Sequence, residues 1–505
     1  MYVPDFAEFC RLAEKGNLVP VYREIIADLD TPVSAFLKLR TDAEGGACCL
    51  LESVTGGENV ARFSYIAVEP RLTIATKDRN VLMHPADGSP QESLLALSQD
   101  PLDVLKEILS RYQYVPLPGW RRFPGGLVGY MAYDLVRFFE ELPAEKPDDL
   151  GLPDIQFMLA DTLVVFDHVL HRVRVVANAH VHGDPQQAYW EAIDRIERII
   201  DKLSRPLPER PKRNGTRPAR VPDDPAALPS TMTRAQHREA VLRAKEYVAA
   251  GDVIQVVLSH RMSVQIDVDP FDIYRALRAV NPSPYMFYLS FGDTRLIGAS
   301  PEILVTEENG NVVTRPIAGT RRRGRDEKED ELLAQELLAD AKERAEHIML
   351  VDLHRNDIGR VCVPGTVRVA PDELMFIERY SHVMHIVSNV TGRLREDRDQ
   401  FDLLRAVFPA GTVTGAPKIR AMEIIEELEP VRRGPYAGAV GYFGFSGAMD
   451  TCITLRTVVM KGDTAYLQAG GGIVADSDPD AEYQETLNKL AAILEAVRMA
   501  DRGLV

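Results

Sequence analysis

The residues of this chain that could do chemistry include carboxylates at helical spacing near the C-terminal end. Glu482 and Glu485 are three residues apart, Lys489 follows four residues later, and all three come after the glycine triplet at 470–472. Such a triplet lets the backbone approach a ligand closely, because no Cβ stands in the way. On spacing alone, these charges could equally form a solvated helix face supported by ion pairs.

A second stretch repeats this arrangement and favours a ligand site. Glu343 and Glu346 are again three residues apart, and an apolar run follows them. Two helices that each present a carboxylate pair can hold Mg²⁺ and leave positions for water and an anionic substrate, since Mg²⁺ binds few protein carboxylates and gives up water reluctantly. We therefore expect Mg²⁺ between these two helices.

Helix signals position the C-terminal carboxylates. Asp478 is typical of an N-cap and Pro479 of a first helical residue. The residues of the apolar stripe recur at spacings of four and three: Tyr483, Leu487, Leu490, Leu494 and Val497. The helix is expected to bury this stripe and to present its carboxylates from another face.

The composition is that of a soluble globular protein with two or three domains. The chain has 505 residues, 45% of them hydrophobic and 27% charged. A net charge of −16 argues against a nucleic-acid partner, which would need clustered Lys and Arg. The five cysteines have no CxxC spacing and indicate reduced thiols. Without a long apolar run or an N-terminal signal, we expect a cytoplasmic protein with no membrane partner.

The chain divides into three expected segments. Residues 1–203 mix helix and strand patterns, including a strand predicted over 35–39, and form an N-terminal regulatory domain. Residues 204–230 are rich in Pro and Arg and predict a linker. Residues 231–500 carry the chemistry. Many strands with interspersed helices, without regular alternation or a GxGxxG unit, favour an α+β fold.

Five ordered motifs identify a family that this chain resembles. They are Pro316-Ile-Ala-Gly-Thr, Lys342-Glu-Arg-Ala-Glu-His, Asp352-Leu-His-Arg-Asn-Asp, Gly411-Thr-Val-Thr-Gly-Ala-Pro-Lys and Gln468-Ala-Gly-Gly-Gly. With them the chain resembles the chorismate-utilising enzymes over nearly its whole length, and among them most closely the anthranilate synthase large-subunit family. The resemblance implies two facing β-sheets, rich in antiparallel strands, with helices outside.

The resemblance also implies a reaction and a metal site. Ammonia attacks chorismate at the 2-position, the 4-hydroxyl departs, and pyruvate is then eliminated as the ring becomes aromatic. By resemblance, Glu346 and Glu485 are direct Mg²⁺ ligands, and Glu343 and Glu482 stand behind them through water. The metal would hold the ring carboxylate as a Lewis acid.

Three residues match catalytic positions of the family. Glu302 matches the residue that protonates the departing hydroxyl, which requires a raised pKa that burial would provide. His385 matches the catalytic histidine; without its flanking motif, a lone histidine on a strand would more often be a core residue. Thr412 lies in the matching loop.

Substrate contacts follow from the same resemblance. Arg456 and Lys489 supply cations for the enolpyruvyl and ring carboxylates. The groups that offer backbone amides or a hydroxyl are Gly319, Thr320, Gly470, Gly471, Gly472 and Tyr436. The glycines can also serve structural turns, and both roles can hold at once.

Two positions distinguish members of the family. Relatives that use water carry a lysine, the water-activating base, where Gln255 stands, and a neutral amide cannot replace it. Aminodeoxychorismate synthases often carry a nucleophilic lysine where Ala318 stands. Both residues therefore disfavour those reactions. Aminodeoxychorismate synthase component I, and a catalytically silent tryptophan-binding homologue, remain as alternatives.

The resemblance further implies a regulator and a partner. The residues that match a tryptophan feedback site come from both halves of the chain: Leu51, Glu52, Ser53, Pro284, Tyr285, Met286, Val440 and Tyr442. Tryptophan bound between the halves could favour one domain arrangement and so inhibit. None of the cysteines lies in a Gly-x-Cys-x-Gly motif, so ammonia from glutamine would require a separate glutamine amidotransferase subunit.

Overall fold

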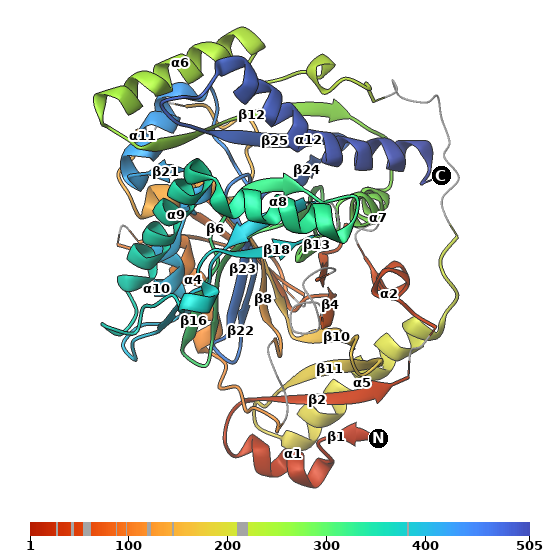
Figure 1. Ribbon diagram of the computed structural model, residues 1–505. Helices are drawn as coiled ribbons and strands as arrows, with labels where there is room; N and C mark the ends of the chain where they lie inside the picture. The colour runs from red at the N-terminus through yellow and green to blue at the C-terminus, as the bar shows by residue number, and fades with distance from the viewer. Residues whose placement is uncertain are drawn as a thin grey trace.

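Two large β-sheets that face each other form the centre of the molecule in the computed structural model (Figure 1). The structure describes residues 1–26, 29–41, 45–53, 62–86, 88–96, 98–118, 123–143, 146–209, 221–380 and 383–504. In this part of the chain, one sheet has twelve strands, the second has ten, and a third has three.

The twelve-stranded sheet, called sheet A, has the spatial order β1 (Tyr2–Val3), β2 (Leu18–Ile25), β11 (Arg172–His180), β10 (Thr162–Asp167), β4 (Phe63–Val68), β3 (Cys48–Glu52), β13 (Tyr285–Phe291), β14 (Thr294–Ser300), β24 (Thr457–Lys461), β25 (Thr464–Ile473), β12 (Gln255–Gln265) and β21 (Gly415–Ala416).

The ten-stranded sheet, called sheet B, runs β20 (Val390–Arg393), β16 (Asn311–Thr314), β15 (Ile303–Glu308), β23 (Met449–Ile453), β22 (Ala439–Gly444), β8 (Gly126–Met131), β9 (Ile155–Ala160), β5 (Leu72–Lys77), β6 (Asn80–Pro85) and β7 (Gln91–Leu94). The small sheet, sheet C, runs β17 (Ile317–Arg322), β19 (Val383–Val387) and β18 (Phe376–Arg379).

The α-helices are α1 (Phe6–Ala13), α2 (Pro32–Leu39), α4 (Pro101–Ser110), α5 (Pro185–Ser204), α6 (Arg234–Ala250), α7 (Pro270–Val280), α8 (Glu327–Ala339), α9 (Ala341–Gly359), α10 (Gln400–Val407), α11 (Lys418–Leu428) and α12 (Pro479–Arg502). Among the described residues, no helix combines the length and the apolar character that crossing a bilayer requires.

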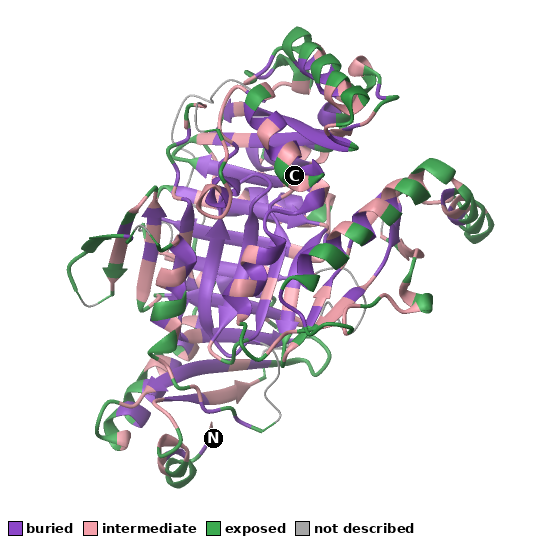
Figure 2. Ribbon diagram, turned by 90° about the vertical axis from the view of Figure 1, so that its left-hand side faces the viewer, coloured by how far each residue is buried: buried purple, intermediate pink, exposed green. Residues whose placement is uncertain are grey.

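Three apolar layers hold the sheets and helices together. Side chains such as Val128 of β8 and Phe287 of β13 form the layer between sheets A and B. The outer side of sheet A packs against α1, α2, α5, α7 and α12, and that of sheet B against α4, α9 and α10. Figure 2 shows the resulting pattern, with buried strands at the centre and exposed outward helix faces. The predicted α+β fold with two facing sheets is confirmed.

Both sheets contain strands from residues 1–203 and from residues 231–500. In sheet A the change occurs where β3 pairs with β13, and in sheet B where β8 pairs with β22, both antiparallel. The proposed boundaries at 203 and 231 stay predictions, and residues 210–220 of the linker lie outside the described residues. The main chain thus joins the two halves through continuous hydrogen bonding.

The strand predicted over residues 35–39 is wrong, since these residues belong to α2. Thr31 and Ser34 form a capping box, in which the Thr31 hydroxyl accepts from Ser34 N at 3.1 Å and the Ser34 hydroxyl accepts from Thr31 N at 2.8 Å. Pro32 then occupies the first helical position, which its fixed φ suits. The capping box and Pro32 therefore start a helix at this short apolar run.

Candidate active site and a second cavity

The predicted C-terminal helix is confirmed as α12. Asp478 caps it by accepting hydrogen bonds from Asp480 N and Ala481 N, and the whole predicted apolar stripe is buried. Next to α12, the glycine triplet at 470–472 lies in β25, paired with β12. A Cβ on Gly471 would stand 2.9 Å from Glu482 Oε2, so the absence of a side chain lets this carboxylate reach the strand.

The other carboxylate pair lies on α9, as predicted. The Asp340 side chain caps this helix by accepting from the backbone amides of Lys342 and Glu343. Glu343 pairs with Arg321 at 3.2 Å and lies against Gly319, where a Cβ would stand 3.0 Å from Glu343 Oε2. Gly319 also has φ +66, a left-handed conformation that favours glycine.

The two helices bring Glu346 and Glu485 within electrostatic reach of each other. Burial raises the pKa of Glu346, a hydrogen bond from Gln255 Nε2 at 3.1 Å opposes this, and the charges of Glu343 and Glu485 raise the pKa further. On α12, Lys489 Nζ pairs with Glu485 at 2.8 Å and donates to Gly470 O at 2.8 Å. Each carboxylate is thus held by groups of the chain itself.

These carboxylates fit a Mg²⁺ site of the open kind. Within the described residues, no three His, Cys, Asp or Glu side chains form a group that would enclose a metal ion. However, Mg²⁺ usually takes only one or two protein carboxylates and completes its shell with water and substrate oxygens. Hard oxygen donors on α9 and α12 meet that need, and the charge of Glu485 on α12 acts on Glu346 on α9 by raising its pKa.

Glu302 is buried, and its carboxyl group is only partly satisfied by hydrogen bonds. It is 6% exposed, and burial raises its pKa to about 8, against opposing effects of the Thr412 hydroxyl and the Arg456 guanidinium. Glu302 Oε1 and Thr412 Oγ1 are buried without a hydrogen-bond partner among the described residues. Glu302 is therefore protonated at neutral pH and can donate to a group that enters the site.

Arg456 is a cation with few partners in the described part of the chain. Its hydrogen bond there is a 3.4 Å contact from Nη1 to Asn281 Oδ1, and burial lowers its pKa. It has φ 48, a strained conformation for a residue with a side chain. A partly buried guanidinium that has no carboxylate ion pair among the described residues is well suited to bind a carboxylate of a substrate.

His385 projects from β19 with a defined tautomer. Its Nδ1 lies 2.9 Å from Gly319 O and 3.1 Å from Thr320 Oγ1. A carbonyl oxygen only accepts, so Nδ1 carries the proton and Nε2 keeps a lone pair. Burial lowers the pKa of His385, which keeps the imidazole neutral.

Tyr436 is the remaining predicted substrate contact. It is buried, and a Cβ on Gly470 would stand 3.0 Å from its hydroxyl. The predicted catalytic, substrate and metal residues therefore come from β25, α9, α12, sheet C and the segments next to them, while their roles stay predictions.

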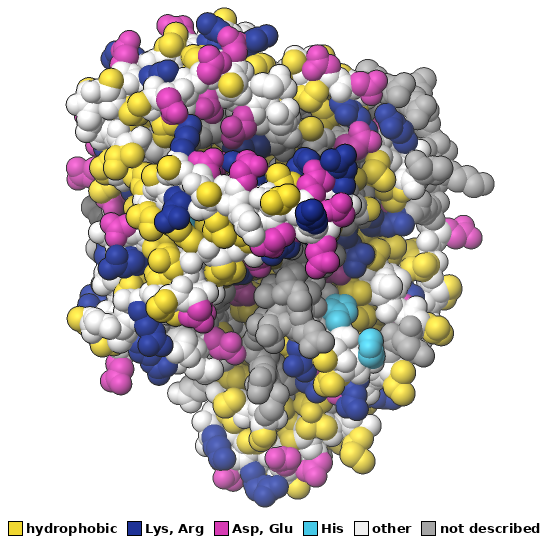
Figure 3. All heavy atoms as spheres, viewed as in Figure 1, with side chains coloured by type: hydrophobic (Ala, Val, Ile, Leu, Met, Phe, Trp, Pro, Cys, Tyr) yellow, Lys and Arg dark blue, Asp and Glu magenta, His cyan; other side chains and the backbone are white. Residues whose placement is uncertain are grey.

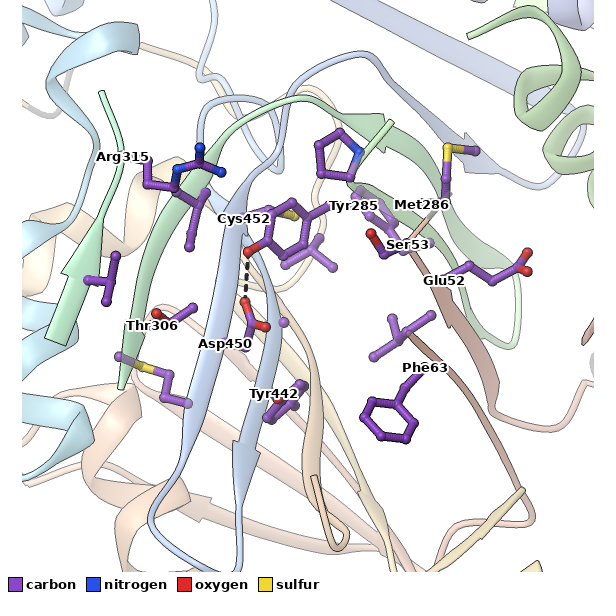
Figure 4. Close-up of a pocket in the computed structure, with 18 of the residues that line it drawn as sticks. Glu52, Ser53, Phe63, Tyr285, Met286, Thr306, Arg315, Tyr442, Asp450 and Cys452 are labelled. Carbon is purple, nitrogen blue, oxygen red and sulfur yellow. Dashed lines mark hydrogen bonds between the residues drawn. The ribbon is translucent and has the colours of Figure 1, made fainter. Parts of the chain in front are cut away.

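A second cavity contains every residue predicted to bind tryptophan. It has a volume of about 320 Å³ and lies between β3, β4 and β13 of sheet A and β15, β22 and β23 of sheet B (Figure 4). All eight predicted residues line it: Leu51, Glu52, Ser53, Pro284, Tyr285, Met286, Val440 and Tyr442. Glu52 accepts from the Tyr274 hydroxyl at 2.5 Å, and Tyr285 donates to Asp450 at 3.0 Å.

The cavity and the active site share walls. Pro301 and Ile303 line the cavity, and Glu302 stands between them in the chain. Ile317 lines it two residues before Gly319, and Tyr380 lines it while its ring lies 5.6 Å from that of His385. A ligand that shifted the backbone of Pro301, Ile303 or Ile317 would also shift Glu302 or Gly319, because these residues are neighbours in the chain.

A family model described as chorismate binding enzyme matches residues 46–495. The chain belongs to the chorismate-binding enzyme family. Similar relatives include anthranilate synthase component 1 of Acetivibrio thermocellus, 48% identical over 99% of both chains, and that of Thermus thermophilus, 50% identical over 96% of this chain and 99% of the relative.

Solved structures agree with this family. Anthranilate synthase component I from Streptococcus pneumoniae matches with a TM-score of 0.72 at 36% identity, covering 94% of this chain and 99% of that one. A menaquinone-specific isochorismate synthase from Escherichia coli shares the fold, with a TM-score of 0.67 at 20% identity over 97% of this chain and 98% of its own.

Sequence reasoning missed a set of buried polar residues next to the site. Glu429 and Arg433 form an ion pair, and both are almost fully buried. Arg433 also donates to Val413 O, next to Thr412. Their spacing of four residues is the one signal in the sequence, and it is shared with ordinary surface pairs on helices. Only the three-dimensional arrangement distinguishes them.

Proposed function

We propose that this chain is a lyase that forms anthranilate and pyruvate from chorismate and ammonia. The observation that carries the proposal is Glu302, a carboxyl that is protonated at neutral pH, lacks a partner at Oε1 and lies near the Arg456 guanidinium. An acid beside a carboxylate-binding cation is what the loss of a hydroxyl from an anionic ring requires. The full-length relatives named anthranilate synthase component 1 support the same reaction.

The side chains of this protein divide the work. Glu302 donates its proton to the departing 4-hydroxyl oxygen, and Arg456 binds a carboxylate of the substrate. His385 offers the lone pair of Nε2 as an acceptor. The backbone of the glycine strand lies close to the ring because no Cβ intervenes. Burial keeps water away from the Glu302 carboxyl. Water would stabilise the carboxylate and so lower the pKa of Glu302.

Glu346 and Glu485 would hold Mg²⁺, with Glu343 and Glu482 behind them. Bound there, the ion supplies Lewis-acid stabilisation for a substrate carboxylate. In the structure, Lys489 pairs with Glu485 and Arg321 pairs with Glu343. Binding of the ion would release part of that pairing.

Two residues support ammonia as the nucleophile over the alternatives. Gln255 uses its amide to donate to Glu346 and has no basic group to activate water. Ala318, buried in β17, has no group that could attack the substrate. Aminodeoxychorismate formation is the second candidate, since it uses the same substrate, and it is distinguished by its product.

Tryptophan is proposed as the inhibitor that occupies the second cavity. The cavity is lined by aromatic and aliphatic side chains with a few polar groups, and its volume suits a small ligand. Because Pro301, Ile303 and Ile317 line it, a bound ligand can bias the position of Glu302 and Gly319. The proposed inhibition is therefore allosteric.

A glutamine amidotransferase subunit is the proposed partner. The relatives are named component 1, which supports the existence of a second component. Alone, the chain is expected to use free ammonium salt and not glutamine.

The test is incubation of the purified chain with chorismate, MgCl₂ and ammonium chloride. We expect a fluorescent product, anthranilate, together with an equal amount of pyruvate, and no product when glutamine replaces ammonium. A non-fluorescent amino product would support aminodeoxychorismate formation, and absence of turnover would support the catalytically silent alternative.

A further inference from the structure

A buried ion pair lies behind the active site, between Glu429 at the end of α11 and Arg433 in the segment that leads to β22. Its side chains are 5% and 1% exposed. The contact is two-pronged: Arg433 Nε donates to Glu429 Oε2 at 2.9 Å, and Nη2 donates to Oε1 at 2.6 Å. This geometry fixes both the direction and the distance of the guanidinium.

The remaining donors of Arg433 reach two different backbone segments. Nη1 donates to Val413 O at 2.7 Å, in the short helical turn at Gly411–Val413 that carries Thr412. Nη2 also donates to Val257 O at 2.8 Å, in β12. One side chain thus connects the catalytic loop to the strand beside the glycine triplet.

Glu429 holds the same strand from its own side. Its Oε1 accepts from Ser259 N at 2.8 Å and from Ser259 Oγ at 2.9 Å. In the register of β12 and β25, Ser259 is opposite Gly470 and Val257 is opposite Gly472. The ion pair therefore contacts the two β12 residues that face the ends of the glycine triplet.

The guanidinium also packs against two tyrosine rings. Its central carbon lies 4.8 Å from the ring centroid of Tyr133 and 5.7 Å from that of Tyr436. The Tyr436 hydroxyl is the group next to Gly470. Thr412, Tyr436 and the glycine triplet, which come from separate parts of the chain, are all supported by this one pair.

We infer that the Glu429–Arg433 pair is a positioning device that fixes the Thr412 loop, Tyr436 and the glycine strand in mutual register for chorismate. A buried ion pair is weak evidence for stability, because removing two charges from water offsets most of their attraction, and apolar residues of similar size are often at least as stable. What apolar residues lack is direction, and here Nη1 and Nη2 of Arg433 each donate to a different backbone carbonyl. The inference rests on the proposed function, since chorismate turnover is its readout.

The first test compares Arg433→Lys with Arg405→Lys. Arg405 makes a matched two-pronged contact to Asp100, at 2.7 and 3.0 Å, between α10 and α4 and outside the site. Lysine keeps the charge but cannot reach Glu429, Val413 and Val257 together. We expect kcat/KM for chorismate to fall by about tenfold or more in Arg433→Lys, since small misplacements of catalytic groups cost up to about 10². Arg405→Lys should stay close to the parent.

The second test separates positioning from folding. In the double variant Glu429→Leu with Arg433→Met, no charge is left unpaired, so the protein should still fold cooperatively. Its thermal midpoint should fall only moderately, because Ser259 N, Val413 O and Val257 O lose a hydrogen-bond partner. The rate should still fall as in Arg433→Lys. A double variant that is folded and fully active would overturn the inference, and so would an Arg433→Lys variant that loses no more activity than Arg405→Lys.

A pH profile provides a readout that simple destabilisation would not change. The Thr412 hydroxyl lies beside the Glu302 carboxyl, outside hydrogen-bond geometry, and its polarity and the charge of Arg456 both lower the pKa of Glu302. Of the two, only Thr412 lies in the turn that Arg433 holds. The basic limb of the rate profile should therefore move to higher pH in Arg433→Lys, and an unmoved limb would count against the inference. If the parent itself makes no anthranilate, the proposed function fails instead, so the two failures are distinguishable.

Discussion

The second cavity takes its lining from both halves of the chain and the proposed active site takes its residues from the second half, and the two regions differ in how their charges are satisfied. The cavity is a formed, mostly apolar space in which Tyr285, Asp450 and Glu52 already have partners. In the proposed active site, Glu302 Oε1 and Thr412 Oγ1 have no hydrogen-bond partner in the described part of the chain, and Glu485 is paired with the neighbouring Lys489. The cavity suits a small ligand with an apolar body, whereas the proposed active site offers the charged groups that the proposed binding of an anionic substrate and Mg²⁺ would use.

This difference also explains their separate places in the fold. An apolar cavity can form where two sheets face each other, because the layer between them is already apolar. The proposed active site instead uses the first turns of α9 and α12 and the glycine strand β25, where carboxylates and cations come together outside the layer between the two sheets. On the face shown in Figure 3, acidic and basic side chains are intermingled, so charge of one sign gathers only locally.

The largest expected effect comes from Glu302→Gln, which removes the acid and keeps the shape. We expect kcat to fall by about 10² to 10⁴, because general acid catalysis contributes this much. Tryptophan binding in the separate cavity should be retained within a small factor. Anthranilate fluorescence measures the first and titration calorimetry the second. Loss of tryptophan binding together with activity would show that the two regions are not distinct.

The next largest effect is expected for Glu346→Gln, which removes a proposed metal ligand. The Mg²⁺ concentration for half-maximal rate should rise by more than the roughly 10 to 100-fold that changes behind a metal ligand typically cause. Glu336→Gln, in a residue of α8 that pairs with Arg321, is the control and should behave as the parent. An unchanged Mg²⁺ dependence would remove Glu346 from the metal site.

A selective effect is expected for Ser53→Phe, which fills part of the cavity. The tryptophan concentration for half inhibition should rise by about tenfold or more, since overpacking costs on the order of 1 to 3 kcal/mol. The rate without tryptophan should stay near that of the parent. A variant as sensitive to tryptophan as the parent would mean that the effector binds elsewhere.

The smallest effect concerns pH within the working range. Glu302 must be protonated to act as an acid, so the rate falls as the pH rises, to about half its maximum near pH 8. The raised pKa also means that its contribution to stability is present below the unfolded pKa and is lost as the pH rises toward 8. Glu302→Gln should therefore lose less stability over this range, measured by denaturant unfolding at several pH values.

Local signals predicted much of this structure. Asp478, Pro479 and the apolar stripe gave α12 its start and its buried face. Of the five cysteines, Cys48, Cys49, Cys362 and Cys452 are buried and Cys10 is half-buried, while their reduced state stays a prediction. These features depend on neighbours in sequence, so the sequence alone defines them.

What could not be predicted depends on contacts between distant residues. Nothing near Glu429 indicates that it lies behind Ser259, which is 170 positions away in the chain. The pairing of β3 with β13 likewise joins residues from both halves, and only this pairing places Ser53 and Tyr285 on one cavity. The strand predicted over 35–39 failed for a local reason, since a short apolar run does not reveal its period and the cap at Thr31 decided it.

The most direct measurement of the central claim follows the nitrogen atom. The purified chain is incubated with chorismate, MgCl₂ and isotopically labelled ammonium chloride, and the products are identified by mass spectrometry. The account predicts anthranilate that carries the label, with pyruvate in equal amount. Isochorismate, or an unlabelled product, would contradict it.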